Sequence, residues 1–183
     1  MMKKILVVVG HTGAGKSTIC KNISDMYNIP LISFASAGKD FSNKLGYKRI
    51  RECYKEIGVE KFKKEFSEFF FNCITDHITK CDALIIDGLY IDDVADICKQ
   101  NYSTLFVYID VPKEICVRRV SERMHTSENV YSEYSLKEDL KEHLGNDAVI
   151  ANADAIIDGT KDREIVLRDM LDLDFVSSFI RSQ

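Results

Sequence analysis

The sequence predicts a three-layer α/β fold in which a five-stranded parallel sheet is flanked by helices on both faces. Two observations support this prediction: short apolar runs without polar alternation, and longer segments of helical periodicity between them. Strands that are buried on both faces of a parallel sheet are apolar at consecutive positions. Because parallel strands need a crossover connection, usually a helix, the alternation of the two kinds of segment favours a doubly wound sheet.

Three apolar runs are the strongest strand candidates, at residues 5–9, 83–86 and 104–109. Weaker candidates lie at residues 30–34 and 155–157. The segments with helical spacing are residues 17–27, about 60–81, 91–100, 112–124 and 136 to about 151, with a last helix beginning near Asp162. This order predicts five parallel strands in a single domain, residues 1–183.

Length and charge narrow the class of protein. The 183 residues correspond to one ordinary domain. The 25 Lys and Arg against 29 Asp and Glu give a formal net charge of −4, which does not favour nucleic acid or an anionic membrane as the main partner. The first apolar run is far shorter than the roughly 20 residues that span a bilayer, and no cleavage site follows it, so we expect a cytoplasmic protein.

Two further stretches of the sequence each allow two structural interpretations. Residues 124–135 lack apolar periodicity, which is typical of a functional loop or a mobile lid. An aromatic stripe at helical spacing lies in the longest predicted helix, at Phe62, Phe66, Phe69 and Cys73. Such a stripe favours core packing, and the alternative is the wall of a pocket for a flat ligand.

A phosphate-binding motif of the form GxxxxGK[ST] lies between the first strand and the first helix. With the residue after it, it comprises Gly10, His11, Thr12, Gly13, Ala14, Gly15, Lys16, Ser17 and Thr18. Backbone N–H groups at a helix N-terminus form a cradle for triphosphate oxygens. We expect Lys16 to neutralise the β and γ phosphates of ATP and the Ser17 hydroxyl to ligate Mg²⁺.

Two aspartates compete for the role of the second magnesium ligand. Asp87 and Asp110 both follow an apolar strand, and ligands of open α/β sheets bind at the carboxyl ends of the strands. We favour Asp87 because Gly88 follows it and allows a substrate to approach the backbone, whereas Asp110 precedes a helix start at Pro112. The alternative for Asp87 is a simple turn or capping residue.

Three arginines lie on the predicted helix 112–124. Arg118 can pair with Glu122 four residues on. Arg119 and Arg123 have no such partner, and like charges at this spacing repel. An anion between them would explain the arrangement, since guanidinium groups bind phosphoryl oxygens at two points. The alternative is a solvated basic face.

With these motifs in place, the sequence resembles the P-loop nucleotide kinases, namely the adenylate-kinase-like group, the dephospho-CoA kinases and related small kinases. The segments that carry the resemblance are GHTGAGKST, IPLIS, ALIIDGLYIDDVADI, FVYIDVPKEICVRRVSER and ADAIIDGTKD. The resemblance implies a P-loop NTPase fold with a short lid, places Arg119 and Arg123 at the lid, and places Asp158, Gly159 and Thr160 near the base of the nucleotide.

The sequence departs from that family on the acceptor side. Nucleoside monophosphate kinases usually carry an arginine shortly after the second strand and another just after the Asp-Gly pair; neither stretch has one here. Three other basic residues can supply the missing charge: Lys39, Arg49 and Arg51.

The functional hypothesis is an ATP- and Mg²⁺-dependent kinase with a small-molecule phosphate acceptor, most simply a nucleotide-like one. Lys16, Asp87, Arg119 and Arg123 are the catalytic candidates. One alternative is transfer to a hydroxyl, as in a dephospho-CoA kinase, for which Asp87 would take the proton. The other is an ATP-binding switch or partner-binding module without efficient transfer.

Overall fold

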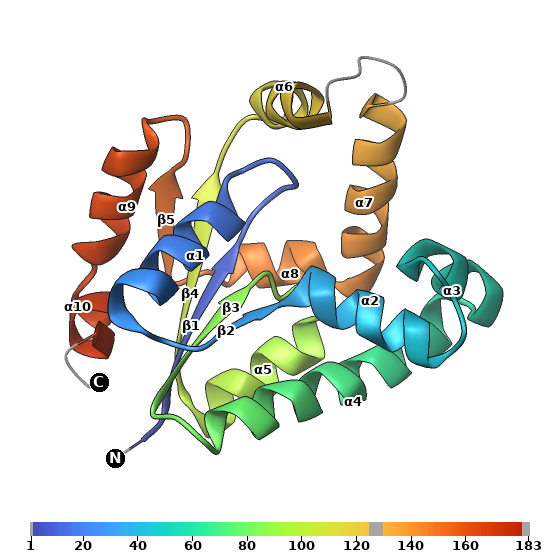
Figure 1. Ribbon diagram of the computed structural model, residues 1–183, viewed down its shortest axis with the longest axis horizontal. Helices are drawn as coiled ribbons and strands as arrows, with labels where there is room; N and C mark the ends of the chain where they lie inside the picture. The colour runs from blue at the N-terminus through green and yellow to red at the C-terminus, as the bar shows by residue number, and fades with distance from the viewer. Residues whose placement is uncertain (1, 125–129, 181–183) are drawn as a thin grey trace.

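The computed structural model describes residues 2–124 and 130–180, and it contains the predicted five-stranded parallel sheet (Figure 1). The strands are β1 (Lys4–Val9), β2 (Leu31–Ser33), β3 (Ala83–Asp87), β4 (Ser103–Asp110) and β5 (Ala155–Asp158). They lie in the order β2-β3-β1-β4-β5, and each neighbouring pair is parallel. The five strands predicted from apolar runs are therefore confirmed.

Helices cover both faces of the sheet. They are α1 (Lys16–Tyr27), α2 (Phe34–Lys44), α3 (Ile50–Ile57), α4 (Val59–Ile78), α5 (Asp92–Asn101), α6 (Lys113–Met124), α7 (Val130–Leu144), α8 (Asn146–Ala151), α9 (Arg163–Leu171) and α10 (Asp174–Ile180). Ile5 and Val7 of β1 pack in one core with α2, α4 and α5, whereas Leu6 and Val8 pack in a second core with α1, α6 and α9. These side chains alternate between the faces of a strand that is buried on both sides, which accounts for the unbroken apolar run.

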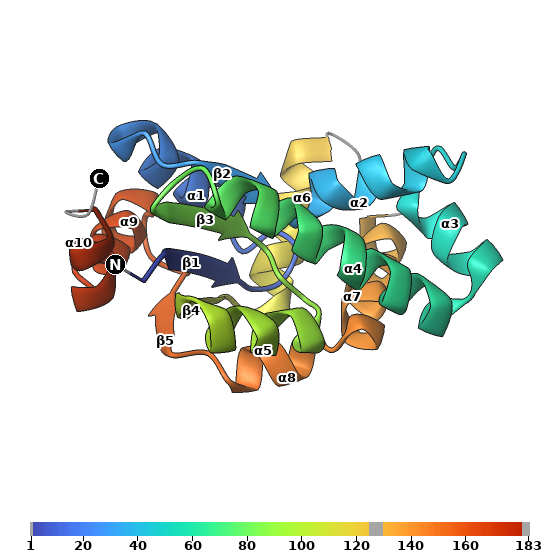
Figure 2. The same cartoon turned by 90° about the horizontal axis from the view of Figure 1, so that it is seen from below.

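Beyond the carboxyl ends of the strands, α2, α3 and α4 project past the sheet, and α7 stands beside them (Figure 2). Among the described residues, no helix is both long and apolar enough to cross a membrane.

Several helices differ from the sequence prediction. Phe34 begins α2 instead of ending the second strand, because the Ser33 hydroxyl accepts a hydrogen bond from the Ser36 N–H at 3.4 Å and caps the helix. The helices α2, α3 and α10 were not predicted, and the helix predicted from residue 136 is divided at Gly145 into α7 and α8.

The predicted lid lies partly outside the described residues, at 125–129. From Val130 onward that stretch is helical, within α7. Tyr134 is the first residue of α7 whose side chain is described, and it is buried. Apart from Tyr134, residues 132–135 are polar. The apolar periodicity that indicates a helix is therefore missing from this part of the sequence.

The aromatic stripe forms core, as expected. Phe62 and Phe66 are fully buried, together with Phe70, while Phe69 is partly buried beneath the ammonium group of Lys44. At the other end of the chain, Phe179 of α10 is fully buried in the second core. The tail therefore docks on the body of the protein.

Candidate active site

The phosphate-binding motif lies between the end of β1 and the start of α1. Gly13 and Gly15 have φ angles of 93° and 98°, a region that L-amino acids other than glycine rarely adopt. A Cβ atom on Gly13 would lie 2.5 Å from the backbone oxygen of Cys116, so the loop packs directly on α6. Gly15 has open space around it and leaves the first N–H groups of α1 accessible to a ligand.

Lys16 is folded back over its own loop. Its Nζ donates a hydrogen bond to the backbone oxygen of His11 at 2.8 Å, and the residue is 7% exposed. Burial, aided by the nearby ammonium group of Lys141, lowers the pKa of Lys16 to about 8, although Asp87 acts in the opposite direction. Two buried ammonium groups in one site favour the binding of an anion.

A cavity of about 310 Å³ opens beside the loop. Its walls come from the loop, the end of β3, the start of α2, the start of α3, the end of α6 and α7. The residues that line it are Thr12, Gly13, Lys16, Ser17, Phe34, Ala35, Ile50, Asp87, Tyr90, Arg123, Lys137, Leu140, Lys141 and Leu144. Loop and strand ends thus meet at the edge of the sheet where open α/β folds bind ligands.

Of the two competing aspartates, Asp87 lies at this cavity with Lys16 and Ser17. Asp110 ends β4, where its Oδ1 accepts a hydrogen bond from the Tyr108 hydroxyl at 3.2 Å, and it is not among the described residues that line the cavity. A hydroxyl and a carboxylate are oxygen donors of the kind that Mg²⁺ prefers, so Ser17 and Asp87 fit the metal that a phosphate loop implies. Their roles remain our prediction.

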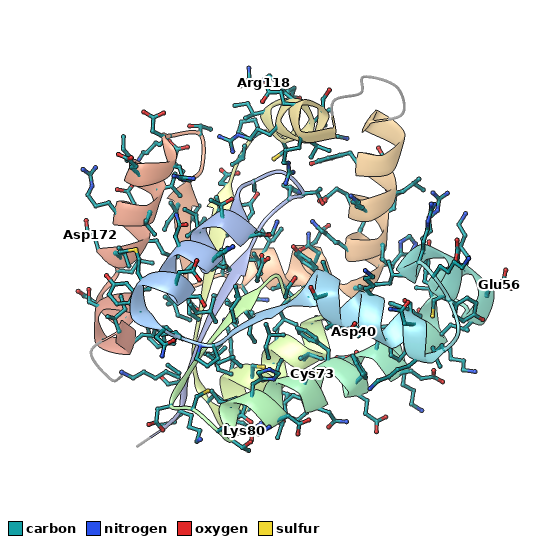
Figure 3. The ribbon with its side chains drawn as sticks, in the orientation of Figure 1. Asp40, Glu56, Cys73, Lys80, Arg118 and Asp172 are labelled. Atoms are coloured by element: carbon teal, nitrogen blue, oxygen red, sulfur yellow. The ribbon has the colours of Figure 1, made fainter. Side chains whose placement is uncertain are left out.

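The two arginines of α6 separate in the structure. The Nη2 of Arg119 donates a hydrogen bond to the backbone oxygen of Gly159 at 3.0 Å, so its guanidinium group lies at the turn that follows β5. Arg123 lines the cavity. Arg118 points away from the body of the protein at the outer side of α6 (Figure 3), where its Nε lies 4.0 Å from the Glu122 carboxylate.

The turn after β5 is internally satisfied. The Asp158 carboxylate accepts hydrogen bonds from the backbone N–H of Thr160 at 2.9 Å and from its hydroxyl at 2.6 Å, which lowers the pKa of Asp158. A Cβ atom on Gly159 would clash with the Ile109 and Val111 side chains, so glycine allows the turn to lie flat against β4. Arg119 therefore connects α6 to the turn that the family resemblance places near the nucleotide base.

Sequence reasoning missed a partly buried polar cluster between α7 and the phosphate loop. Glu138 accepts hydrogen bonds from the backbone N–H of Thr12 at 3.0 Å and from Lys141 Nζ at 2.8 Å, and its other oxygen lies 2.6 Å from His11 Nδ1. Lys141 Nζ also donates to the Thr12 hydroxyl at 3.0 Å. We call Glu138, Lys141, His11 and Thr12 the loop clamp.

The loop clamp explains how its charges are tolerated below the surface. Burial raises the pKa of the Glu138 carboxyl, but the hydrogen bonds from His11, Lys141 and Thr12 outweigh it and hold that pKa well below its usual range. Burial also lowers the pKa of Lys141, against the attraction of Glu138. Each charge therefore depends on its partner.

Lys141 also reaches the place where the family resemblance leads us to expect an arginine. Its Nζ lies 4.5 Å from the ring centroid of Tyr90, which follows the Asp-Gly pair. The ammonium group of Lys141, on α7, thus lies beside Tyr90, where an arginine was expected. The other basic candidates for the missing charge, Lys39, Arg49 and Arg51, are exposed and are not among the described residues that line the cavity.

With the geometry established, comparison with known proteins identifies the family. The AAA domain family matches residues 6–141, which is more than half of the chain. The chain belongs to that family. Shikimate kinases from two strains of Staphylococcus epidermidis are 24% identical to it over 120 residues, which cover 66% of this chain and 66% of each relative, just under two thirds.

Solved structures agree on the fold. Shikimate kinase from Bacteroides thetaiotaomicron has a TM-score of 0.63 at 18% identity, over 94% of this chain and 98% of that one. A gluconokinase from Sinorhizobium meliloti has a TM-score of 0.64 at 13% identity, over 99% and 95%. The P-loop fold and the resemblance to small kinases of the adenylate-kinase-like type are therefore confirmed.

Proposed function

We propose that the protein is an ATP- and Mg²⁺-dependent kinase that transfers the γ-phosphoryl group to a small-molecule acceptor. The observation that carries the proposal is the meeting of Lys16, Ser17 and Asp87 at one cavity, at the start of a helix that follows a phosphate-binding loop. The names of the similar proteins, shikimate kinase and gluconokinase, support a small-molecule acceptor.

The roles of the residues follow from their positions. Lys16 leaves the His11 carbonyl and binds phosphate oxygens, and Arg123 approaches the transferring group from the end of α6. Ser17 and Asp87 would hold Mg²⁺, which supplies charge neutralisation when it is bound. Asp158, Gly159 and Thr160 would bound the base side of the nucleotide, with Arg119 fixed against them.

A hydroxyl is the acceptor group that the comparisons favour over the nucleotide-like acceptor expected from the sequence. Shikimate and gluconate carry hydroxyl groups, and a carboxylate near the reacting centre can take the proton of a hydroxyl. In this step the acceptor oxygen bonds to the γ-phosphorus, the bond from that phosphorus to ADP breaks, and the proton passes to Asp87. A phosphate acceptor needs no such base.

The test is ADP formation by the full chain with Mg²⁺ and ATP, over acceptors that include alcohols, nucleosides, nucleoside monophosphates and dephospho-CoA. Asp87→Asn should lower acceptor-dependent turnover by about two orders of magnitude or more, because the metal ligand and base are lost. Asp110→Asn is the matched control and should remain active. Binding of ATP without acceptor-dependent ADP from any compound would instead favour the ATP-binding switch.

A further inference from the structure

The cavity beside the phosphate loop is lined by residues of two chemical kinds. One kind comprises the loop, Asp87 and the ammonium group of Lys16. The other kind comprises apolar side chains from three helices, which we call the apolar wall: Phe34 and Ala35 of α2, Ile50 of α3, and Leu140 and Leu144 of α7. An acceptor that places its reacting oxygen near Asp87 can lay the rest of its body on this wall.

The apolar wall is held firmly in place. The ring of Phe34 makes edge contacts with Phe66, Phe70 and Tyr90, each with ring centroids 5.0 Å apart. Leu144 is fully buried. Ile50 packs so closely on Gly38 that a Cβ atom there would lie 2.5 Å from its Cδ1. Close packing of this kind keeps the wall from rearranging to admit a differently shaped ligand.

Three polar residues of the described lining neighbour the apolar wall: Lys137 and Lys141, on α7 with Leu140 and Leu144, and Tyr90, against Phe34. Lys141 is engaged by Glu138 and the Thr12 hydroxyl. Tyr90 is 6% exposed, and its hydroxyl is directed at Gly88. Lys137 is exposed, on the same face of α7 as Leu140 and Lys141, and it is the remaining cation of that helix on the lining.

These surroundings select against a polyhydroxylated body. A hydroxyl that is buried without a hydrogen-bond partner loses its water, at a cost of about tenfold or more in affinity. An apolar body on the same wall instead gains from burial. The cavity volume of about 310 Å³ lies at the small end of ligand sites and suits a body of one ring or a short branched chain.

We propose that the acceptor is a compact molecule with an apolar body, one ring or a short branched chain, whose main polar group is the oxygen that receives the phosphoryl group. This inference rests on the proposed kinase function and names its substrate class. It separates the protein from kinases of polyhydroxy acids, although those are among its structural neighbours.

The test compares acceptors that share a reacting group and differ in the polarity of the body. The alcohol pairs are 3-methylbutan-1-ol against erythritol and benzyl alcohol against shikimate, and the phosphate pair is 3-methylbutyl phosphate against glycerol 3-phosphate. We expect the apolar member of the reactive pair to have a kcat/KM about tenfold or more higher. The alcohol and phosphate arms show which oxygen reacts.

Two substitutions test whether the apolar wall determines the selectivity for the acceptor. Leu140→Gln and Ile50→Asn should each lower the ratio of apolar to polyol kcat/KM by about fivefold or more, because they give a hydroxyl a partner. Leu45→Gln, at an exposed leucine after α2 that is not among the cavity lining, should leave the ratio unchanged. Two wall positions are used so that one poorly folded variant does not decide the result.

The outcomes separate this inference from the function on which it rests. ADP formation with the polyol at an equal or greater kcat/KM, or an unchanged ratio in both wall variants, overturns the apolar acceptor and leaves the kinase intact. With a non-hydrolysable ATP analogue and Mg²⁺ bound, an apolar probe should also raise the melting temperature. If every apolar probe neither reacts nor binds at millimolar concentration, the inference is wrong, whereas failure to bind the analogue refutes the kinase itself.

Discussion

The carboxylate of Glu138 accepts a hydrogen bond from the backbone N–H of Thr12 at 3.0 Å. This contact joins the helix that follows the predicted lid to the second variable position of the phosphate loop. The same carboxylate lies 2.6 Å from His11 Nδ1 and accepts from Lys141 at 2.8 Å. The position of the loop in the free protein therefore depends on one partly buried negative charge.

Glu138→Gln should lower the free energy of unfolding by about 2 kcal/mol, because hydrogen bonds to a charged group are lost and Lys141 remains buried without its counter-ion. The exposed neighbour Asp139 provides the matched control, and Asp139→Asn should change stability by less than about 0.5 kcal/mol. Urea denaturation of both variants without nucleotide measures the difference. Equal stabilities would mean that the loop clamp does not hold the fold together.

The contribution of Glu138 should disappear in acid. The folded pKa of this carboxyl lies below its ordinary value of 4.5, so the stabilisation is fully present above that value and declines as the pH falls toward the folded pKa. By about pH 3, most of a 2 kcal/mol difference between the wild type and Glu138→Gln should be lost. Unfolding measured at several pH values tests this, and a difference that stays constant between neutral pH and pH 3 contradicts it.

Gly13 and Gly15 form a second matched pair. Both have φ angles near 95°, but a Cβ atom on Gly13 meets the Cys116 backbone oxygen at 2.5 Å, whereas one on Gly15 meets no atom within 4 Å. Both alanine variants carry backbone strain, and only Gly13→Ala adds a clash with backbone. Gly13→Ala should therefore be less stable by about 1–3 kcal/mol than Gly15→Ala without ligand. Thermal or chemical unfolding measures the stability of both variants. Equal losses of stability would show that backbone strain, and not the clash with Cys116, determines the cost of alanine in the loop.

The sheet was predictable because its signal is local and strong. Residues 5–9 and 83–86 are apolar at every position, as strands covered on both faces must be. Two of the helices that project past the sheet, α2 and α3, were not predicted, whereas α4 was. In α3, Cys53 is the one residue that is fully buried. A short helix that buries so few side chains has no clear apolar periodicity in its sequence.

The candidate site likewise contains residues that the sequence predicted and residues that it did not. The phosphate loop, Asp87 and Arg123 follow from a motif and from strand and helix ends, which fix their places in this fold. Glu138 and Lys141 are distant from the loop in sequence, and a Lys-Glu pair on a polar helix is typical of a solvated face. Only the packing of α7 against the loop shows that Lys141 is buried and Glu138 is partly buried. The wall residue Phe34 was assigned to a strand for a similar reason, since Ser33 gives no sign in sequence that it caps α2.

Lys16 should account for the response to nucleotide. ATP with Mg²⁺ should stabilise the protein by about 2.7 kcal/mol at a hundredfold excess over the dissociation constant, because a ligand of the native state shifts the unfolding equilibrium. Lys16→Met should remove most of this gain, whereas Lys21→Met, at an exposed position of α1, should retain it. Thermal shift measurements with and without ATP provide the comparison, and an unchanged shift in Lys16→Met would place the nucleotide elsewhere.

The two arginines of α6 should affect different kinetic constants. Arg119 is tied to the Gly159 carbonyl at 3.0 Å, at the turn where we place the nucleotide base, while Arg123 lines the cavity with Lys16 and Asp87. Arg119→Gln should therefore raise the KM for ATP by about tenfold with a small change in kcat, since it removes binding that is equal in the ground and transition states. Arg123→Gln should instead lower kcat by about a hundredfold or more, because it removes a charge that acts on the transferring phosphoryl group.

Arg118→Gln is the control for both, since its side chain is 68% exposed and pairs with Glu122 across solvent. Initial rates at varied ATP and acceptor concentrations separate the constants. If Arg119→Gln and Arg123→Gln show the same loss of kcat with an unchanged KM, both arginines act on the phosphates, and the hydrogen bond of Arg119 to Gly159 is given up when the substrates bind. If both variants match Arg118→Gln, the basic residues of α6 form a solvated face and take no part in the reaction.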